Sequence, residues 1–165
     1  MKKINNIFII ILFLTICSEL FASSPISIHG DWTLSKVKVE KDDLCYIASL
    51  PTEKEGTYKK RGEPYITVVR KKGATYDEIS LSSGFIYDPE KDIEVSILKR
   101  KFPMFSNEEK AWTYDKNDDV EMVKLMKKAA KMYVVSYAKT GVKANDTYSL
   151  IGFNEAYSKM IELCK

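Results

Sequence analysis

The chain has 165 residues and a formal net charge of +3, and 45% of its residues are hydrophobic and 12% aromatic. This composition supports one domain with a real core and excludes a chain that is disordered throughout. The mild positive charge argues against nucleic acid as a main partner, because a nucleic-acid-binding domain is strongly basic or carries an obvious basic cluster.

The N-terminal segment has the features of a secretory signal peptide. Two lysines follow the first methionine, and residues 7–16 form an almost unbroken apolar run. This run is about half of the roughly 20 residues that a membrane-spanning helix needs. Ala22 offers a cleavage site after the run. We therefore predict a cleaved signal peptide over 1–22 and a single mature domain over 23–165, with an uncleaved N-terminal anchor as the alternative.

Cys17 ends a stretch that is similar to a lipoprotein box, which would attach the protein to a membrane. Ile16 stands directly before it, where a small residue is normal. We therefore predict that Cys17 is removed with the signal and is not lipidated. Cleavage removes two lysines and one glutamate, so the net charge falls from +3 to +2 in the mature domain.

The first half of the mature domain alternates apolar and polar residues in the manner of half-buried β-strands. Trp32, Leu34, Val37 and Val39 follow this period with one slip, which predicts a bulge or bend. The predicted strands cover residues 32–39, 44–50, 64–70 and 78–82, with a polar loop or hairpin excursion at 52–62.

The second half adds helices. Strands are predicted at 93–98, 111–114, 132–138 and around 148–150. The period changes at Asp118 and Asp119, which we expect to cap a helix with the shared apolar face Met122, Leu125, Met126 and Ala129. A C-terminal helix follows Gly152 and presents Phe153, Tyr157, Met160, Ile161 and Cys164 on one face. Short strands with these two helices favour a mainly β fold, an antiparallel β-sandwich, over an α/β fold.

Two cysteines, Cys45 and Cys164, remain in the mature domain. In an exported protein such a pair is most simply one disulfide. The bond would close a loop of about 120 residues, which is worth roughly 4–5 kcal/mol in the chain-entropy model. A redox pair or a metal pair is the alternative, but there is no C-x-x-C motif and His29 is the sole histidine.

No reaction follows from the sequence. His29 beside Asp31 resembles a base with its orienting carboxylate, but no nucleophile motif lies near. Asp118, Asp119 and Glu121 match no calcium-loop spacing, and the glycines are scattered turns, so we infer no catalytic residue, metal or cofactor.

Two basic groups form a possible binding surface for an anionic membrane or a host surface, the alternative being a solvated rim. They are Lys99, Arg100 and Lys101, and Lys124, Lys127, Lys128 and Lys131. Seven tyrosines are either part of a binding face or core positions of the sheet. They are Tyr46, Tyr65, Tyr76, Tyr87, Tyr114, Tyr133 and Tyr137.

Three segments resemble the invasion-associated locus B family of exported bacterial proteins. They are Gly30-Asp31-Trp32, the stretch from 116 through the predicted helix to 135, and the closing motif at 146–156, which is the most specific. Many members have further cysteines, whereas this chain resembles the branch with one early and one C-terminal cysteine. The resemblance implies an immunoglobulin-like β-sandwich, export, an association with entry into host cells, and no known catalytic residues.

The leading prediction is an exported bacterial protein that is located in the periplasm, or is secreted or on the outer surface. We expect it to act by binding a protein partner in the envelope or on a host cell, and not to be an enzyme. A small-ligand carrier or hydrolytic enzyme using His29 and Asp31 is one alternative, and a structural or chaperone-like envelope factor is another. The identity of the partner and the oligomeric state do not follow from the sequence.

Overall fold

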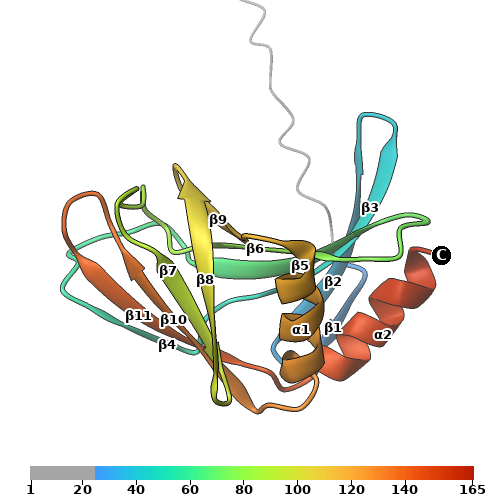
Figure 1. The fold of residues 1–165 in the computed structure, drawn as a ribbon. Coiled ribbons are helices and arrows are strands. Elements are labelled where there is room, and N and C mark those ends of the chain that lie inside the picture. Colours follow the sequence, from blue (N-terminus) through green and yellow to red (C-terminus); the bar gives the residue numbers. More distant parts are fainter. Residues whose placement is uncertain (1–24) are drawn as a thin grey trace, which may run out of the picture.

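The computed structural model describes residues 25–165 (Figure 1). The predicted signal peptide, its cleavage site and Cys17 lie outside the described residues. The described part contains eleven strands and two helices. The strands are β1 (Ser27–His29), β2 (Trp32–Val39), β3 (Asp42–Ser49), β4 (Glu53–Gly56), β5 (Tyr65–Lys71), β6 (Glu78–Ser82), β7 (Ile93–Ile97), β8 (Arg100–Asn107), β9 (Lys110–Thr113), β10 (Lys131–Tyr137) and β11 (Lys143–Ser149). The helices are α1 (Lys116–Met126) and α2 (Phe153–Leu163).

All these strands belong to one antiparallel sheet, in the order β1-β2-β3-β5-β6-β9-β8-β7-β10-β11-β4. The sheet is strongly bent, with β2, β3 and β5 on one side of the molecule and β7, β10 and β11 on the other (Figure 1). Its two ends meet where the Trp32 indole Nε1 donates to the Ser149 carbonyl (3.1 Å) and the Asp31 amide donates to the Ile151 carbonyl (3.1 Å).

This architecture confirms the predicted mainly antiparallel β class with a late helix and a C-terminal helix, and it is consistent with a β-sandwich. Hydrogen bonding continues from one layer to the other through β6, β9 and β8. In that respect the fold differs from an immunoglobulin domain, in which two separate sheets pack face to face.

The inner face of the bent sheet carries the core, as the alternation of apolar residues predicts. Ile66 and Val68 of β5 and Val95 and Ile97 of β7 are fully buried in one apolar cluster. The pattern fails at Val39, which is 49% exposed. The hairpin of β2 and β3 projects beyond the rest of the sheet (Figure 1), so the far end of β2 has no core to face.

The polar segment predicted as a loop or hairpin excursion contains the edge strand β4, which pairs with β11. All four residues of β4 are exposed, and two of them are glutamates. Because β4 is held in the sheet through its backbone, its sequence lacks the alternation of apolar and polar side chains that would predict a strand. Its charged side chains are of the kind that keep an exposed sheet edge from pairing with other chains.

The predicted cap of α1 was wrong in its position. Asp115 is the cap, and its carboxylate accepts hydrogen bonds from the backbone N–H groups of Asn117 (2.6 Å) and Asp118 (3.3 Å). Asp118 and Asp119 lie in the first turn, where acidic side chains suit the helix dipole. Asp119 is buried and accepts a hydrogen bond from the Ile79 N–H (3.0 Å), which ties α1 to β6.

The start of α2 requires glycine. Gly152 has φ +86°, and a Cβ atom there would lie 1.9 Å from the carbonyl oxygen of His29. Without a side chain, the turn before α2 lies directly against the backbone at the end of β1. The helix then buries Phe153, Ala156 and Met160, and the ring of Phe153 packs edge-on against Trp32 with centroids 4.9 Å apart.

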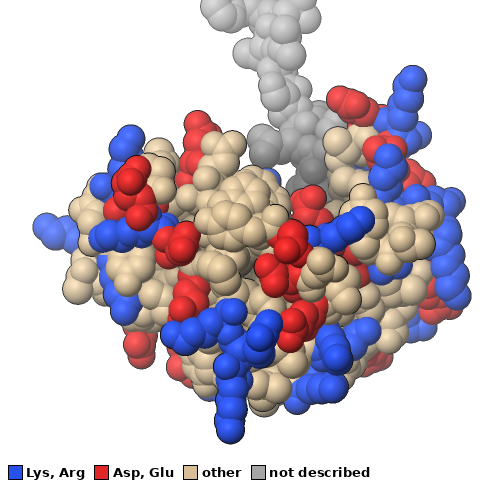
Figure 2. All heavy atoms as spheres, viewed as in Figure 1, with Lys and Arg blue, Asp and Glu red and all other residues tan. Residues whose placement is uncertain are grey.

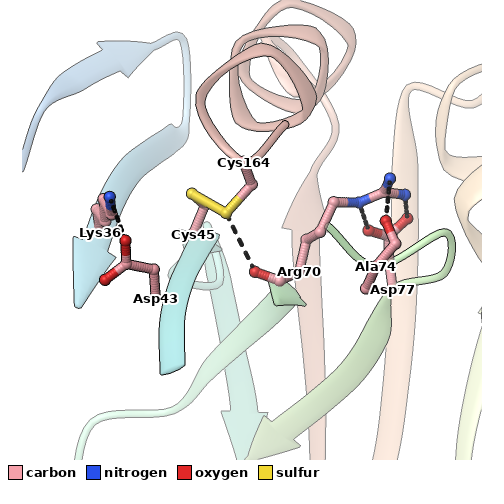
Figure 3. The surroundings of a disulfide bond; sticks show 7 residues. All are labelled: Lys36, Asp43, Cys45, Arg70, Ala74, Asp77 and Cys164. Atoms are coloured by element: carbon pink, nitrogen blue, oxygen red, sulfur yellow. Dashed lines mark hydrogen bonds and ion pairs between the residues drawn. A yellow bond between two sulfur atoms is a disulfide. The ribbon is translucent and has the colours of Figure 1, made fainter. Parts of the chain in front are cut away.

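A disulfide bond fixes the other end of α2 (Figure 3). Cys164 follows the helix and is joined to Cys45 of β3, with 5.9 Å between the Cα atoms and both residues buried. The pairing expected from the cysteine count is therefore present in the structure. The Arg70 carbonyl oxygen lies 3.4 Å from the Cys164 sulfur, and the Gly73 N–H donates to the Cys164 carbonyl (3.1 Å).

An ion-pair network lies beside the disulfide. The Arg70 guanidinium donates to both carboxylate oxygens of Asp77, at 2.7 and 3.0 Å, and to the carbonyl of Ala74 at 3.2 Å (Figure 3). The Tyr157 hydroxyl of α2 donates to the same carboxylate at 2.6 Å. Burial and the hydrogen bond to Asp77 raise the pKa of Tyr157 to about 12. The network is a second connection between α2 and the sheet.

We predict that Cys45→Ala/Cys164→Ala lowers the free energy of unfolding by about 4–5 kcal/mol, because the bond spans 119 residues and removes loop entropy from the unfolded chain. Urea denaturation of the oxidised wild type and of the double variant measures the loss. Reductant should lower the midpoint of the wild type and leave the double variant unchanged. Equal midpoints for the two proteins under oxidising conditions would contradict the prediction.

A second prediction concerns pH. Burial raises the pKa of the Asp119 carboxyl, although the hydrogen bond from Ile79 opposes the rise. The folded protein therefore holds this proton more strongly than the unfolded chain, and the free energy of unfolding falls as pH rises from about 3.8 through the folded pKa. Asp119→Asn cannot ionise and should gain stability relative to the wild type across this interval.

Thermal unfolding of wild type and Asp119→Asn at several pH values between roughly 3.5 and 7 tests this linkage. Asp31→Asn, at an exposed carboxylate, serves as the control for the loss of one negative charge. A difference between Asp119→Asn and wild type that stays constant with pH would show that the Asp119 proton is not linked to folding.

Candidate functional site

The fold brings the two predicted basic groups to one edge of the molecule. Ile97 at the end of β7 pairs with Arg100 on one side and with Met132 on the other, so the β7–β8 turn lies beside the start of β10. Arg100 also forms an ion pair with Glu121 of α1 (3.0 Å). Figure 2 shows basic side chains gathered along the edge formed by this turn and the end of α1.

We call these residues the basic surface: Lys99, Arg100, Lys101, Lys124, Lys127, Lys128 and Lys131, all of which are exposed. Part of its charge is compensated. Lys101 pairs with Glu94 (3.0 Å) and Lys131 with Glu53 (2.9 Å), and the hydrogen bond that Lys131 donates to the Glu53 carboxylate raises the pKa of Lys131.

Three cations of the basic surface have neither a carboxylate nor an aromatic ring as partner among the described residues, and we call these three uncompensated. Within residues 25–165, Lys99, Lys124 and Lys128 form no ion pair, whereas the Lys127 ammonium lies over the Tyr157 ring, 4.0 Å from its centroid. Because exposed ammonium groups keep their hydration at little cost, these three are available to an anionic partner.

A shallow hollow of about 350 Å³ lies between α1 and α2, next to the basic surface. Lys124, Lys127 and Lys128 line it, and the paired Arg70 and Asp77 also border it. The charge of Arg70 is already matched by Asp77, so the lysines carry the unmatched positive charge of the hollow.

The proposed partnership of His29 with Asp31 is corrected by the structure. His29 Nε2 lies 2.9 Å from the Ser27 hydroxyl, and Nδ1 lies 3.2 Å from a carboxylate oxygen of Glu155 on α2. Asp31 is exposed, and its backbone N–H donates to Ile151. The carboxylate beside the imidazole is thus that of Glu155, which is 68% exposed, and the contact links β1 to α2.

The seven tyrosines differ in burial. Tyr87 is buried and Tyr46, Tyr65 and Tyr137 are half-buried, which agrees with their interpretation as sheet positions. Tyr76, Tyr114 and Tyr133 are exposed and come from different parts of the chain.

The sequence reasoning missed a buried ion pair between Arg61 and Asp146, whose side chains are 4% and 0% exposed. The guanidinium donates twice to the carboxylate and also to the Ser83 carbonyl (3.2 Å). Burial opposes the charged guanidinium, but the hydrogen bonds and charge of Asp146 outweigh it, so the pKa of Arg61 is raised. The pair holds the loop after β4 against β11 and against the residue that follows β6, which is a structural role.

Two further observations concern metal ions and membrane-spanning helices. Within the described residues, no group of three or more His, Cys, Asp or Glu side chains is arranged to hold a metal ion. Neither helix of the described part is both long and apolar enough to cross a membrane.

Comparison with known proteins shows a likeness in structure rather than in sequence. No protein-family model and no curated protein matches the chain. The structure is similar to the crystal structure of invasion associated protein B from Bartonella henselae, with a TM-score of 0.60 and 15% sequence identity over 83% of this chain and 95% of that one. At this identity the likeness shows a common fold.

Proposed function

We propose that this chain is an exported bacterial protein that acts by binding, and that the basic surface contacts an acidic protein partner in the envelope or on a host cell. The observation that carries the proposal is the convergence of two separate basic segments on one edge, with three uncompensated cations. Clustered charge of one sign speeds encounter with an oppositely charged partner and favours it over others.

Export is supported by the signal-like N-terminus and by the disulfide, since such bonds persist in oxidising compartments. The structural neighbour is named as an invasion-associated protein, and this supports a role at the host-cell surface. The proposed location is the periplasm or the outer surface. A structural or chaperone-like role in the envelope would use the same surface on a different partner.

Binding is favoured over catalysis because the buried charged groups already have structural partners. Arg61 is held by Asp146, Arg70 by Asp77, and Asp119 by a backbone N–H. Arg70 and Asp77 border the hollow between α1 and α2, but each is already paired with the other.

The basic surface is tested with Lys99→Gln/Lys124→Gln/Lys128→Gln, which removes the three uncompensated cations. We expect binding of the labelled, exported protein to host cells to fall roughly fivefold or more, at a few tenths to 1 kcal/mol per charge. Raising the salt from about 50 to 300 mM should weaken the wild type by a similar factor. The same cells should be entered less often by a strain that carries only the variant.

Lys59→Gln/Lys60→Gln/Lys139→Gln is the matched control, because it removes the same charge from exposed sites outside the basic surface. Equal loss in both variants would refute a specific role for this edge. Protease treatment of the cells removes surface proteins. If the protein binds these treated cells and phosphatidylserine vesicles equally well, the basic surface binds anionic lipid and not a protein. Fractionation that places the protein in the cytoplasm would refute export.

Hydrolysis is the second candidate, because Ser27, His29 and Glu155 lie in the order of a nucleophile, a base and an orienting carboxylate. The binding proposal predicts that a fluorophosphonate probe leaves Ser27 unlabelled and that Ser27→Ala hydrolyses p-nitrophenyl acetate no more slowly than the wild type. Labelling of Ser27 that His29→Ala abolishes would establish the hydrolytic alternative. Glu155→Gln would then be expected to slow labelling as well.

A further inference from the structure

Three adjoining aromatic rings lie on the outer face of the hairpin formed by β8 and β9. Phe105 is the cross-strand partner of Trp112, and its ring centroid lies 5.8 Å from that of Trp112 and 5.5 Å from that of Tyr114. Phe105 is 41% and Tyr114 58% exposed, and Trp112 is half-buried. We call these three residues the aromatic strip.

The core does not require these rings. Phe102 and Met104, on the inner face of β8, are buried in the apolar cluster, while Phe105 points to the other side of the sheet. Adjoining exposed aromatic rings are uncommon on a surface without a partner, and aromatic residues dominate the binding energy of protein interfaces.

A hollow of about 540 Å³ adjoins the strip, and most of the charged residues that line it are acidic. Glu78, Asp115 and Asp119 border it with one cation, Lys116. The Lys116 ammonium lies 4.9 Å from the centroid of the Tyr76 ring, which is not part of the hollow. Figure 2 shows acidic side chains beside an uncharged area in this part of the surface.

The balance of charge in the hollow is negative. Three carboxylates outweigh one lysine, and the N-terminus of α1 adds only about half a positive charge. A fourth carboxylate, that of Asp92, accepts a hydrogen bond from the Tyr114 hydroxyl (3.1 Å) at the edge of the strip. Aromatic faces also attract cations, with the strongest attraction at tryptophan.

From these features we infer that the aromatic strip and its acidic hollow bind a lysine or arginine side chain of a partner polypeptide. The charged end enters the hollow toward Glu78 and Asp115, and the aliphatic stem and neighbouring residues cover the rings. A strip of three rings is longer than a single ammonium group, which favours a polypeptide over a small amine. This site is separate from the basic surface. It selects a cationic partner, whereas the basic surface selects an acidic one.

The test uses the full exported protein and a fluorescein-labelled Ala-Arg-Leu-Lys-Ala peptide, followed by fluorescence anisotropy. The peptide should bind, a version with Glu in place of Arg and Lys should not, and salt should weaken the binding. Glu78→Gln and Asp115→Asn should each weaken it about fivefold. Asp115→Asn keeps the helix cap, because asparagine caps as well as aspartate.

Phe105→Ser should weaken binding at least tenfold, with thermal unfolding measured to show that it is folded. Trp112 supplies an independent signal, since the other tryptophan, Trp32, is fully buried. Binding should change the tryptophan emission of the wild type and leave that of Trp112→Phe unchanged. Glu55→Gln, on exposed β4, is the control for loss of a carboxylate.

Several outcomes would overturn the inference. They are failure of the cationic peptide to bind at millimolar concentration, equal binding of the acidic peptide, and an equal effect of Glu55→Gln. A change in Trp112 emission with chitotetraose but not with peptide would assign the strip to glycans. Concentration-dependent dimerisation that Phe105→Ser abolishes, without peptide binding, would assign it to a second copy of the chain.

Discussion

The arrangement of the domain depends on how the terminal helix is held against the sheet. An isolated helix of eleven residues is marginal in water, so α2 is stable through its contacts and not by itself. The disulfide joins its last turn to β3, and Gly152 lets its first turn lie against the backbone of β1. With both ends fixed, Phe153 covers Trp32, and Trp32 in turn binds the end of β11.

This corner also keeps the bent sheet closed. A sheet of this length would otherwise expose its inner face between its two ends, and the contacts of Trp32 and Asp31 with the segment after β11 join them. The two terminal nitrogens of the buried Arg61 guanidinium are paired with the Asp146 carboxylate, whereas its Nε has no hydrogen-bond partner within the described residues. Removing one member of such a pair is costly because it leaves a buried charge without a partner.

Two regions of the surface carry clusters of charged side chains. The basic surface at the β7–β8 turn and the end of α1 and the acidic hollow beside the aromatic strip suit partners of opposite sign. Two proteins can share a fold and differ in their surface side chains. At 15% identity, the neighbour from Bartonella henselae shows only the path of the chain, so any role of these surfaces is argued from the residues present here.

The sequence alone determined the features that depend on local periodicity and on counting. Alternation at β5 and β7, the helical spacing of Phe153, Met160 and Cys164, and the pair Cys45 and Cys164 were enough to predict a mainly β fold whose C-terminal helix is bound to the sheet by a disulfide. Which residues meet across the sheet was decided only by the tertiary structure. Asp119 became a buried acceptor and Glu155 the partner of His29, and Lys99 came to lie near Lys131, because backbone pairing sets these neighbours and periodicity reports only which face is buried.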